Sequence, residues 1–550
     1  MNYVFWMTGG YGSHPDEGYD PKALPVITGI SYSDMVAKNV TMAANLAGID
    51  GDSFTDICIS NVTIGLSPKP KKVQWNCTDV VGVTSVIIQT FAVIVLLGLV
   101  GFRGVKCGRA GKVLESVSGF SYEAINCRKH SASLTEFGGV GDGSTSNTMA
   151  FRNAIEHLKQ FESDGGSQLI VPPGKWLTGS FNLTSSHFTL FLHKDAIILA
   201  SQDEKEYPVI PFLPSYGRGR DKQGPRYAAF IFGTNLTDVV ITGNNGTIDG
   251  QGASWWENFH KKKLDHTRPY LIEIMYSDQV QISNLTLVNS PNWFVHPVYS
   301  SNLLVLSLTI LAPVDSPNTD GIDPDSCTNV RIEDCYVVSG DDCIAVKSGW
   351  DQYGINFGMP TKHLIIRRLT CISPDSAVIA LGSEMSGGIE DVRAEDIVAI
   401  RSKSGVRIKT ARGRGGYVKD IFARRFEMDT MNVFRMGGDY REHADTGYDP
   451  KALPVITRIN FSDMVAKNVT VAARLAGIEG DSFTDICISN VTIEPSPKPK
   501  KVQWNCTDVV GVTSAVSPPA CSLLPETGNP CPFPTDKLPI DDIQLQTCSY

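Results

Sequence analysis

NTDGIDPDS (residues 318–326) and GDDCIAVKSG (residues 340–349) place three carboxylates at two nearby points of the chain. Asp320 belongs to the first sequence and Asp341 and Asp342 to the second, and Asp341 lies 21 positions after Asp320. A short apolar run precedes each sequence. Paired carboxylates suit hydrolysis of a glycosidic bond, because one protonates the leaving oxygen while the other activates water or attacks.

A short pattern of polar, apolar, any and apolar residues recurs around these sequences. It begins at Asp238, Gln279, Asn302, Asn329, His363, Asp391 and Asp420. From Gln279 onward the steps are roughly 23 to 34 residues, which is typical of a repeat architecture. Short strands joined by turns rich in Gly, Asn and Ser indicate a parallel β-helix, whose coils bury their apolar positions against one another. Neighbouring strands would then lie about 4.8 Å apart.

A step of 21 residues is close to one coil of such a helix. We therefore expect Asp320 and Asp341 on adjacent coils of one face, with Asp342 beside them. The alternative is that all three are ordinary turn residues, since Asp and Gly are common in turns.

The sequence GVRIKT at residues 405–410 adds two cations. Arg407 and Lys409 point to the same side if this segment is a strand. Two cations beside three carboxylates suit an acidic sugar, and Lys347 is a further candidate for a locally basic cleft. The alternative is a solvated strand face.

Three motifs, in this order, resemble the signatures of polygalacturonases, glycoside hydrolase family 28: NTDGIDPDS, GDDCIAVKSG and GVRIKT. ALGSEMSGGIEDV (residues 380–392) resembles the plant probable-polygalacturonase branch. The likeness runs from about residue 127 to residue 515. It implies an all-β fold, a right-handed parallel β-helix (a single-stranded solenoid) with a short N-terminal capping helix. It also implies inverting hydrolysis of α-1,4-galacturonan in pectin, without metal or other cofactor.

The resemblance also implies roles for individual residues. Asp341 corresponds to the general acid, and Asp320 and Asp342 to the pair that holds the attacking water. Arg407 and Lys409 correspond to residues that bind substrate carboxylates. The planar Arg fork suits a carboxylate, and Lys supplies a point charge.

One family feature is missing. The family carries Gly-His-Gly about one coil before the Arg-Ile-Lys strand, and here Ala377 is the position placed nearest to the missing histidine. His296 is a candidate to enter the cleft instead, although a lone histidine is more often structural. Tyr440 is a candidate for stacking on the substrate.

Composition limits the classes of partner. The 550 residues carry a formal net charge of −9, which argues against nucleic acid. Thirteen cysteines without a repeated Cys-x-x-Cys pattern predict disulfides and an oxidising compartment. Several Asn-x-Ser/Thr sequons fit a secreted, cell-wall glycoprotein: Asn182, Asn235, Asn245, Asn284, Asn468, Asn490 and Asn505. We expect a monomer.

Residues 1–85 are a near-copy of residues 430–514 at a constant offset of 429. Both copies contain GYDPKALPVIT and KPKKVQWNCTDVVGVTS, so the first is a partial duplicate of the C-terminal coils. Residues 86–102 form one apolar run near the lower limit for spanning a bilayer. Two interpretations stay open: a signal peptide stranded by gene fusion, or a working anchor that associates the chain with a membrane.

The remaining segments complete the domain plan. Residues 127–515 are expected to form the β-helix domain, whose capping helix opens after Asn147 with apolar residues at helical spacing. Residues 201–227 are expected to be a long loop near one wall of the cleft. Residues 516–550 read as an extended Pro- and Cys-containing tail, pinned by disulfides.

Two alternatives to polygalacturonase activity stay open at this point. A rhamnogalacturonan-type hydrolase would share much of the aspartate set. A catalytically silent pectin-binding wall protein would fit the missing histidine. A pectate lyase would need calcium and an Arg base, and the ordered aspartate motifs argue against it.

Overall fold

The structure is a computed structural model. It describes residues 3–8, 30–40, 42–47, 54–66, 75–78, 80–89, 121–497 and 503–549. The chain divides into two compact units, Met1–Ser118 and Gly119–Tyr550.

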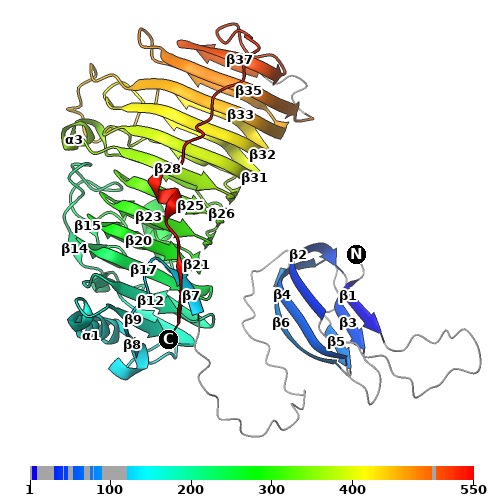
Figure 1. The fold of residues 1–550 in the computed structure, drawn as a ribbon, viewed down its shortest axis with the longest axis vertical. Helices are drawn as coiled ribbons and strands as arrows, with labels where there is room; N and C mark the ends of the chain where they lie inside the picture. The colour runs from blue at the N-terminus through cyan, green and yellow to red at the C-terminus, as the bar shows by residue number, and fades with distance from the viewer. Residues whose placement is uncertain are drawn as a thin grey trace, which may run out of the picture. The chain divides into compact units, whose positions relative to one another are not determined.

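The larger unit is a right-handed parallel β-helix, as the sequence predicted. Each coil contributes to three parallel faces, and Figure 1 shows the coils stacked one on another. The first face contains β8 (His130–Ser133), β9 (Ser167–Val171), β12 (Phe188–Leu192), β17 (Thr237–Gly243), β20 (Asp278–Ser283), β23 (Ser301–Leu306), β25 (Thr328–Glu333), β28 (Thr361–Arg367), the first parts of β31 (Ile389–Lys409), β32 (Tyr417–Gly437), β33 (Val455–Val469) and β35 (Phe483–Pro495), and β37 (Val509–Ser517).

The second and third faces follow in each coil. The second contains β10 (Gly174–Thr178), β13 (Ala196–Ala200), β18 (Gly246–Asp249), β21 (Leu285–Val288), β24 (Thr309–Leu311), β26 (Tyr336–Val338), β29 (Thr370–Ile372) and later parts of the long strands. The third contains β11 (Phe181–Leu183), β16 (Ile231–Thr234), β19 (Ile272–Met275), β22 (Val295–Val298), β27 (Ile344–Val346), β30 (Ala377–Leu381), the ends of β31 and β32, β34 (Val471–Ala476) and β36 (Gln503–Thr507).

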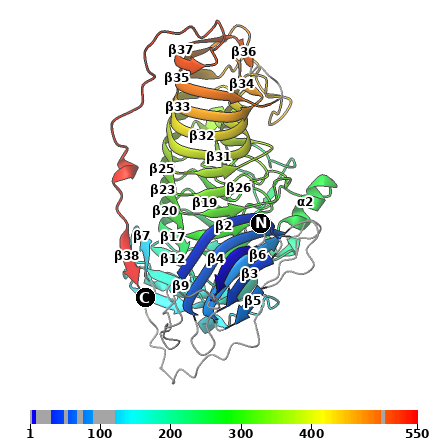
Figure 2. The ribbon, with the colours of Figure 1, turned by 90° about the vertical axis from the view of Figure 1, so that its right-hand side faces the viewer.

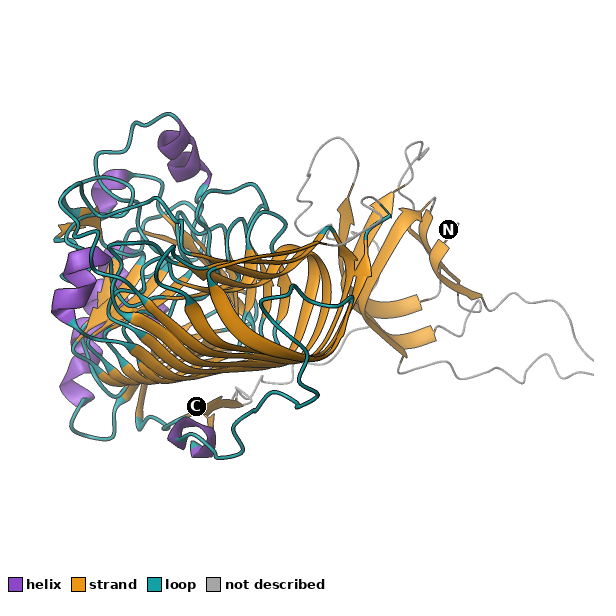
Figure 3. Cartoon of the chain, turned by 90° about the horizontal axis from the view of Figure 1, so that it is seen from above, coloured by secondary structure: helices purple, strands orange, loops and turns teal. Residues whose placement is uncertain are grey.

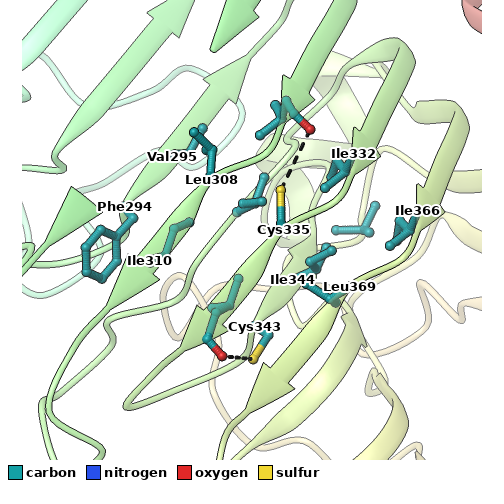
Figure 4. Packing of buried hydrophobic residues seen from close by; sticks show 14 of the residues in the cluster. Phe294, Val295, Leu308, Ile310, Ile332, Cys335, Cys343, Ile344, Ile366 and Leu369 are labelled. Carbon is teal, nitrogen blue, oxygen red and sulfur yellow. Dashed lines mark hydrogen bonds between the residues drawn. The ribbon is translucent and has the colours of Figure 1, made fainter. Parts of the chain in front are cut away.

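The repeated polar residue of the sequence pattern marks a corner of the coil. Asn302, Asn329 and Asp391 have φ angles of 54°, 59° and 52°. This left-handed backbone turns the chain into the first face, and Asn and Asp adopt it more readily than most residues. The apolar residues that follow point inward and stack between coils. Figure 4 shows part of this core around Ile332, Ile344 and Ile366.

Helix α1 (Thr148–Leu158) is the predicted capping helix. Its buried face carries Phe151, Ala154, Ile155 and Leu158, and Phe151 stacks on Phe181 with ring centroids 4.5 Å apart. Such a cap covers the open end of the core and protects its edge strands. Figure 3 looks down the stack of coils and shows helices and loops beside the stacked strands. The other helices up to residue 357 are α2 (Ala253–His260), α3 (Asp351–Phe357), η1 (Leu134–Phe137), η2 (Lys159–Phe161) and η3 (Glu204–Glu206).

The segment between η3 and α2 includes β14 (Val209–Ile210) and β15 (Arg226–Tyr227), which pair as a short antiparallel ribbon. The predicted long loop, residues 201–227, begins just before η3 and ends at β15. Arg220 of the loop pairs with Glu384 at 3.0 Å, so the loop is attached to the turn that follows β30.

The C-terminal tail runs along the outside of the coils, as Figures 1 and 2 show. It contains η4 (Pro539–Asp542) and β38 (Gln546–Ser549), and β38 pairs with β7 (Ser121–Ala124) at the opposite end of the unit. The predicted disulfides are present: Cys127–Cys548, Cys343–Cys371, Cys487–Cys531 and Cys506–Cys521. All three cysteines of the tail, Cys521, Cys531 and Cys548, are thus bonded to residues outside it, and these bonds fix its path.

The smaller unit forms two three-stranded parallel sheets: β1 (Tyr3–Thr8), β3 (Met42–Ala47) and β5 (Trp75–Thr78), and β2 (Ile30–Val40), β4 (Phe54–Leu66) and β6 (Val80–Gln89). Tyr3 pairs with Met42 as Asn432 pairs with Val471, so the two copies share one register at the offset of 429. Of the apolar run at residues 86–102, the part after Gln89 lies outside the described residues. Among the helices that are described, none has the length and hydropathy to cross a membrane.

Candidate active site

The third face brings the three aspartates together. Ile322 bridges to Ile344 on the next coil, so Asp320 and Asp342, each two residues earlier, are adjacent in register. One oxygen from each of Asp320, Asp341 and Asp342 lies within 4.8 Å of the others. The prediction that a step of about 21 residues places them on adjacent coils is confirmed.

The turn before β27 fixes the position of Asp341. Ser339 Oγ donates to the carbonyl of Thr319 at 2.7 Å and accepts the Asp341 N–H at 2.9 Å. Gly340 passes so close to Ser316 that a Cβ there would meet the Ser316 carbonyl, which explains the glycine. The Cys343–Cys371 disulfide then ties this turn to the next coil.

Asp342 is held in its ionised form. Burial would raise the pKa of Asp342, but the charges of Lys409 and Arg407 outweigh burial and lower it. Lys409 Nζ lies 2.6 Å from Oδ2, and Oδ1 accepts hydrogen bonds from Ser376 Oγ at 2.6 Å and from the Ala377 N–H at 3.0 Å. Both oxygens of this carboxylate are therefore engaged.

Asp320 and Asp341 have the opposite tendency. Burial, and then the negative charge of Asp342, raise the pKa of Asp341. Burial, and then the charge of Asp341, raise the pKa of Asp320 well above its ordinary value. Among the described protein groups, none donates a hydrogen bond to Asp320 Oδ1. The cluster thus combines one firmly ionised carboxylate with two that favour a proton.

This electrostatic arrangement has a consequence for stability. A carboxyl group whose pKa is raised by folding destabilises the folded state at pH values above its ordinary pKa, because the unfolded chain releases the proton more readily there. We therefore expect Asp320→Asn to raise the melting temperature at pH 7. Below the ordinary carboxyl pKa of 3.8 the native group is protonated, so the gain should disappear there. Thermal unfolding at pH 3 and pH 7 measures both.

The exposed Asp315 provides the matched control, because Asp315→Asn removes one charge from the same region without removing a buried carboxylate. An Asp320→Asn protein that melts at or below the parent temperature at pH 7 would contradict the expectation.

Arg407 and Tyr440 lie near this cluster. Arg407 is partly buried and forms no ion pair with any residue that the structure describes, although its charge lowers the pKa of Asp342. The Tyr440 N–H donates to the Thr410 carbonyl at 3.0 Å, directly after Lys409. Burial raises the pKa of Tyr440, which keeps its hydroxyl protonated. The structure therefore brings Arg407 and Lys409 to Asp342, and places Tyr440 near Lys409.

His296, the candidate to enter the cleft, is buried instead, as the structural alternative predicted. Its side chain is fully buried, and its ring nitrogens contact Glu273 at 2.9 Å and Asp325 at 3.4 Å. The rings of Tyr270 and Trp293 meet its edges. Two carboxylates on one imidazole, with Tyr216 donating to Asp325 at 2.5 Å, make this an interior ionic cluster.

Lys347 also differs from its expected role in a basic cleft. It is 3% exposed, and its Nζ lies 3.7 Å from Asp320, 3.4 Å from Asp323 and 3.5 Å from Glu384. Asp320, Asp323 and Glu384 compensate the charge of Lys347 inside the protein. Lys347 therefore holds Asp320 in place. Glu384 was missed by the sequence reasoning, because its distance along the chain gives no signal of this contact.

The position placed nearest to the missing histidine lies beside Asp342, because the Ala377 N–H donates to Asp342 Oδ1 at 3.0 Å. Ala377 begins β30, and its side chain packs with Ala345 and Ala380. Ser376 is the residue whose side chain reaches Asp342. The Ser376 hydroxyl thus donates a hydrogen bond to Asp342 at this point of the coil.

The residues present fit a proton-transfer site better than a metal site. The three aspartates are close enough to ligate one cation. However, Lys409 already contacts Asp342, and Lys347 lies next to Asp320. Ca²⁺ takes six to eight oxygen ligands, and two neighbouring ammonium groups oppose a further cation.

Comparison with known proteins agrees with this geometry. Residues 167–517 match the family described as Glycosyl hydrolases family 28. The chain belongs to this family. A probable polygalacturonase of Vitis vinifera is 65% identical over 483 residues, which cover 87% of this chain and 96% of that protein. A probable polygalacturonase of Arabidopsis thaliana is 29% identical and covers 70% of this chain and 79% of its own length.

A solved structure of the family has the same architecture. The exopolygalacturonase of Thermotoga maritima superposes with a TM-score of 0.62 at 27% identity, covering 74% of this chain and 94% of that one. The family 28 match spans both aspartate motifs and the Arg407–Lys409 strand.

Proposed function

We propose that the chain hydrolyses α-1,4 linkages between galacturonate residues of pectin. In this proposal Asp341 is the general acid, Asp320 and Asp342 hold the attacking water, and Arg407 and Lys409 bind substrate carboxylates. The observation that carries it is the electrostatic contrast within one cluster: the pKa of Asp341 is raised, and that of Asp342 is lowered. Groups with such opposed environments serve as acid and base.

The chemistry follows from these states. Asp341 donates its proton to the glycosidic oxygen as the bond to the anomeric carbon breaks. Water held between Asp320 and Asp342 attacks that carbon from the other face, and its proton passes to a carboxylate of the pair. Asp320 Oδ1, without a donor among the described groups, is the acceptor best placed to hold this water.

The proposal includes inversion of the anomeric configuration. Inverting enzymes typically hold their carboxyl groups about 6.5–9.5 Å apart, whereas the oxygens here approach within 4.8 Å. Both oxygens of Asp342 are committed to Lys409, Ser376 and Ala377, which makes it a poor nucleophile. A water shared by two carboxylates needs less space than one held by a single distant base.

The full chain incubated with polygalacturonic acid is expected to release new reducing ends. Proton NMR during the first turnovers should show the β-anomer of the new end, as inversion of an α-linkage requires. Cleavage confined to rhamnogalacturonan would support the rhamnogalacturonan-type hydrolase. Binding to pectin without cleavage of either polymer would support the silent wall-binding protein, an alternative that the absent histidine favours.

We also propose secretion to the cell wall as a monomer. The four disulfides and the sequons support an oxidising, secretory route. Retention at a membrane through residues 86–102 is the alternative, and fractionation of an expressing cell separates the two.

A further inference from the structure

Three arginines occupy the same position on three successive coils of the third face. Arg407 at the end of β31 pairs in register with Arg435 at the end of β32, and Arg435 pairs with Arg474 of β34. Neighbouring strands lie about 4.8 Å apart, so the three side chains start from one straight column. One coil earlier the column holds Ala380. This arginine column (Arg407, Arg435 and Arg474) therefore begins beside the candidate active site and extends toward the C-terminal coils.

The column carries more positive charge than its surroundings compensate. Arg474 pairs with Asp439 at 2.9 Å, and both side chains are well exposed. Neither Arg407 nor Arg435 has a carboxylate partner in the part of the chain that the structure describes. Burial, and then the like charges of Arg407 and Arg474, lower the pKa of Arg435. Three stacked cations in a protein of net charge −9 would gain from anions placed along them.

The near-copy at residues 1–85 shows that the coil does not need these arginines. Trp6 stands at the position of Arg435, and Asn45 at the position of Arg474. Trp6 and Asn45 pair in the same register as the two arginines. The same backbone pairing therefore forms with uncharged residues at these positions. The coil does not require arginine there for its structure.

We propose that Arg435 and Arg474 continue the carboxylate-binding function of Arg407 along the next two coils. The site would then engage consecutive unesterified uronate residues on the C-terminal side of the aspartates. The planar guanidinium fork suits each carboxylate, whereas a methyl ester offers no charge to it. This inference rests on the proposed function and specifies which blocks of the polymer the site prefers.

The test uses the full chain with the first copy's own residues: Arg435→Trp, Arg474→Asn and the double variant. Affinity for oligogalacturonates of two to six residues is measured by calorimetry in an Asp341→Asn background, which prevents turnover. We expect Arg435→Trp to weaken binding of the longer oligomers by roughly 10- to 100-fold, as loss of a charged hydrogen-bond partner does. Dimer binding should change little. Arg474→Asn should have a smaller effect, because Arg474 is exposed and already paired.

The matched control is a substitution that removes a cation from the first face of the same coils. Arg458 lies at the start of β33, pairs with Asp420 at 2.5 Å, and is glycine in the first copy. Arg458→Gly should leave oligomer affinity unchanged at every length. Arg435→Gln replaces the tryptophan variant if that one does not fold, and Arg435→Lys should restore part of the affinity.

The possible outcomes distinguish failure of this inference from failure of the proposed function. A parent chain that neither cleaves nor binds any oligogalacturonate would refute the proposed function. A second outcome would refute only the proposed role of the arginine column. In that outcome the parent cleaves, and the double variant binds oligomers of every length as tightly as the parent at every salt concentration. Length-dependent loss with a shallower salt dependence would establish that role.

Discussion

Replacing Asp341 by Asn should lower kcat on polygalacturonic acid by about 10²- to 10⁴-fold, the usual contribution of a general acid. Asn cannot supply a proton to the leaving oxygen, yet it keeps the size of the side chain. Affinity for oligogalacturonate should remain within a few-fold, because Arg407 and Lys409 are unchanged. Reducing-end release and calorimetry on the same preparation measure the two quantities.

The pH profile and an activated substrate make this prediction specific to the acid role. Activity of the parent should fall as pH rises through the raised pKa of Asp341, because the acid then loses its proton. The variant should lack this alkaline limb. A substrate with a good phenolate leaving group needs no protonation, so it should recover much of the lost rate in Asp341→Asn but not in Asp342→Asn.

Asp375→Asn is the matched control for this change. Asp375 is exposed and lies next to Ser376, so its replacement alters charge near the site without removing a carboxylate of the cluster. It should retain the parent's rate. Our assignment of Asp341 would be untenable if Asp341→Asn cleaved the polymer as fast as this control.

The sequence was sufficient to predict the coil and the carboxylates because both depend on local patterns. The repeated corner residues, such as Asn302 and Asn329, set the coil length, and that length places Asp320 beside Asp342. The cations Arg407 and Lys409 followed from the alternation of a strand. These inferences need only spacing along one segment.

The remaining features depend on side-chain contacts between distant segments. Lys347 looked available for substrate, but Glu384 and Asp323 hold it inside. His296 looked available for the cleft, but Glu273 and Asp325 enclose it. No local pattern shows which carboxylate meets which cation when burial selects the pairs. The arginine column likewise required the register between coils, although the exchange of Trp6 for Arg435 between the copies was visible in the sequence.

Removing the Cys127–Cys548 disulfide should destabilise the larger unit by about 2–5 kcal/mol. This bond joins residues 421 apart and fixes the end of the tail to the first strand pair. Without it, only the tail's other contacts oppose release, including the Arg367–Asp541 ion pair at 2.7 Å. We expect Cys127→Ser with Cys548→Ser to lower the melting temperature and to expose the tail to proteases, which thermal unfolding and limited proteolysis measure.

The Cys506–Cys521 disulfide supplies the comparison, because it closes a loop of only 15 residues. In the chain-entropy account a 15-residue loop is worth about 3 kcal/mol and a 100-residue loop about 4.7 kcal/mol, so the longer closure should cost more to lose. A larger loss at Cys506–Cys521 would show that local packing outweighs loop entropy here. An unchanged melting temperature in the Cys127–Cys548 variant would mean that β38 and η4 bind the coils strongly enough without it. Because the tail lies on the first face and the aspartates on the third, kcat should be unchanged in either case.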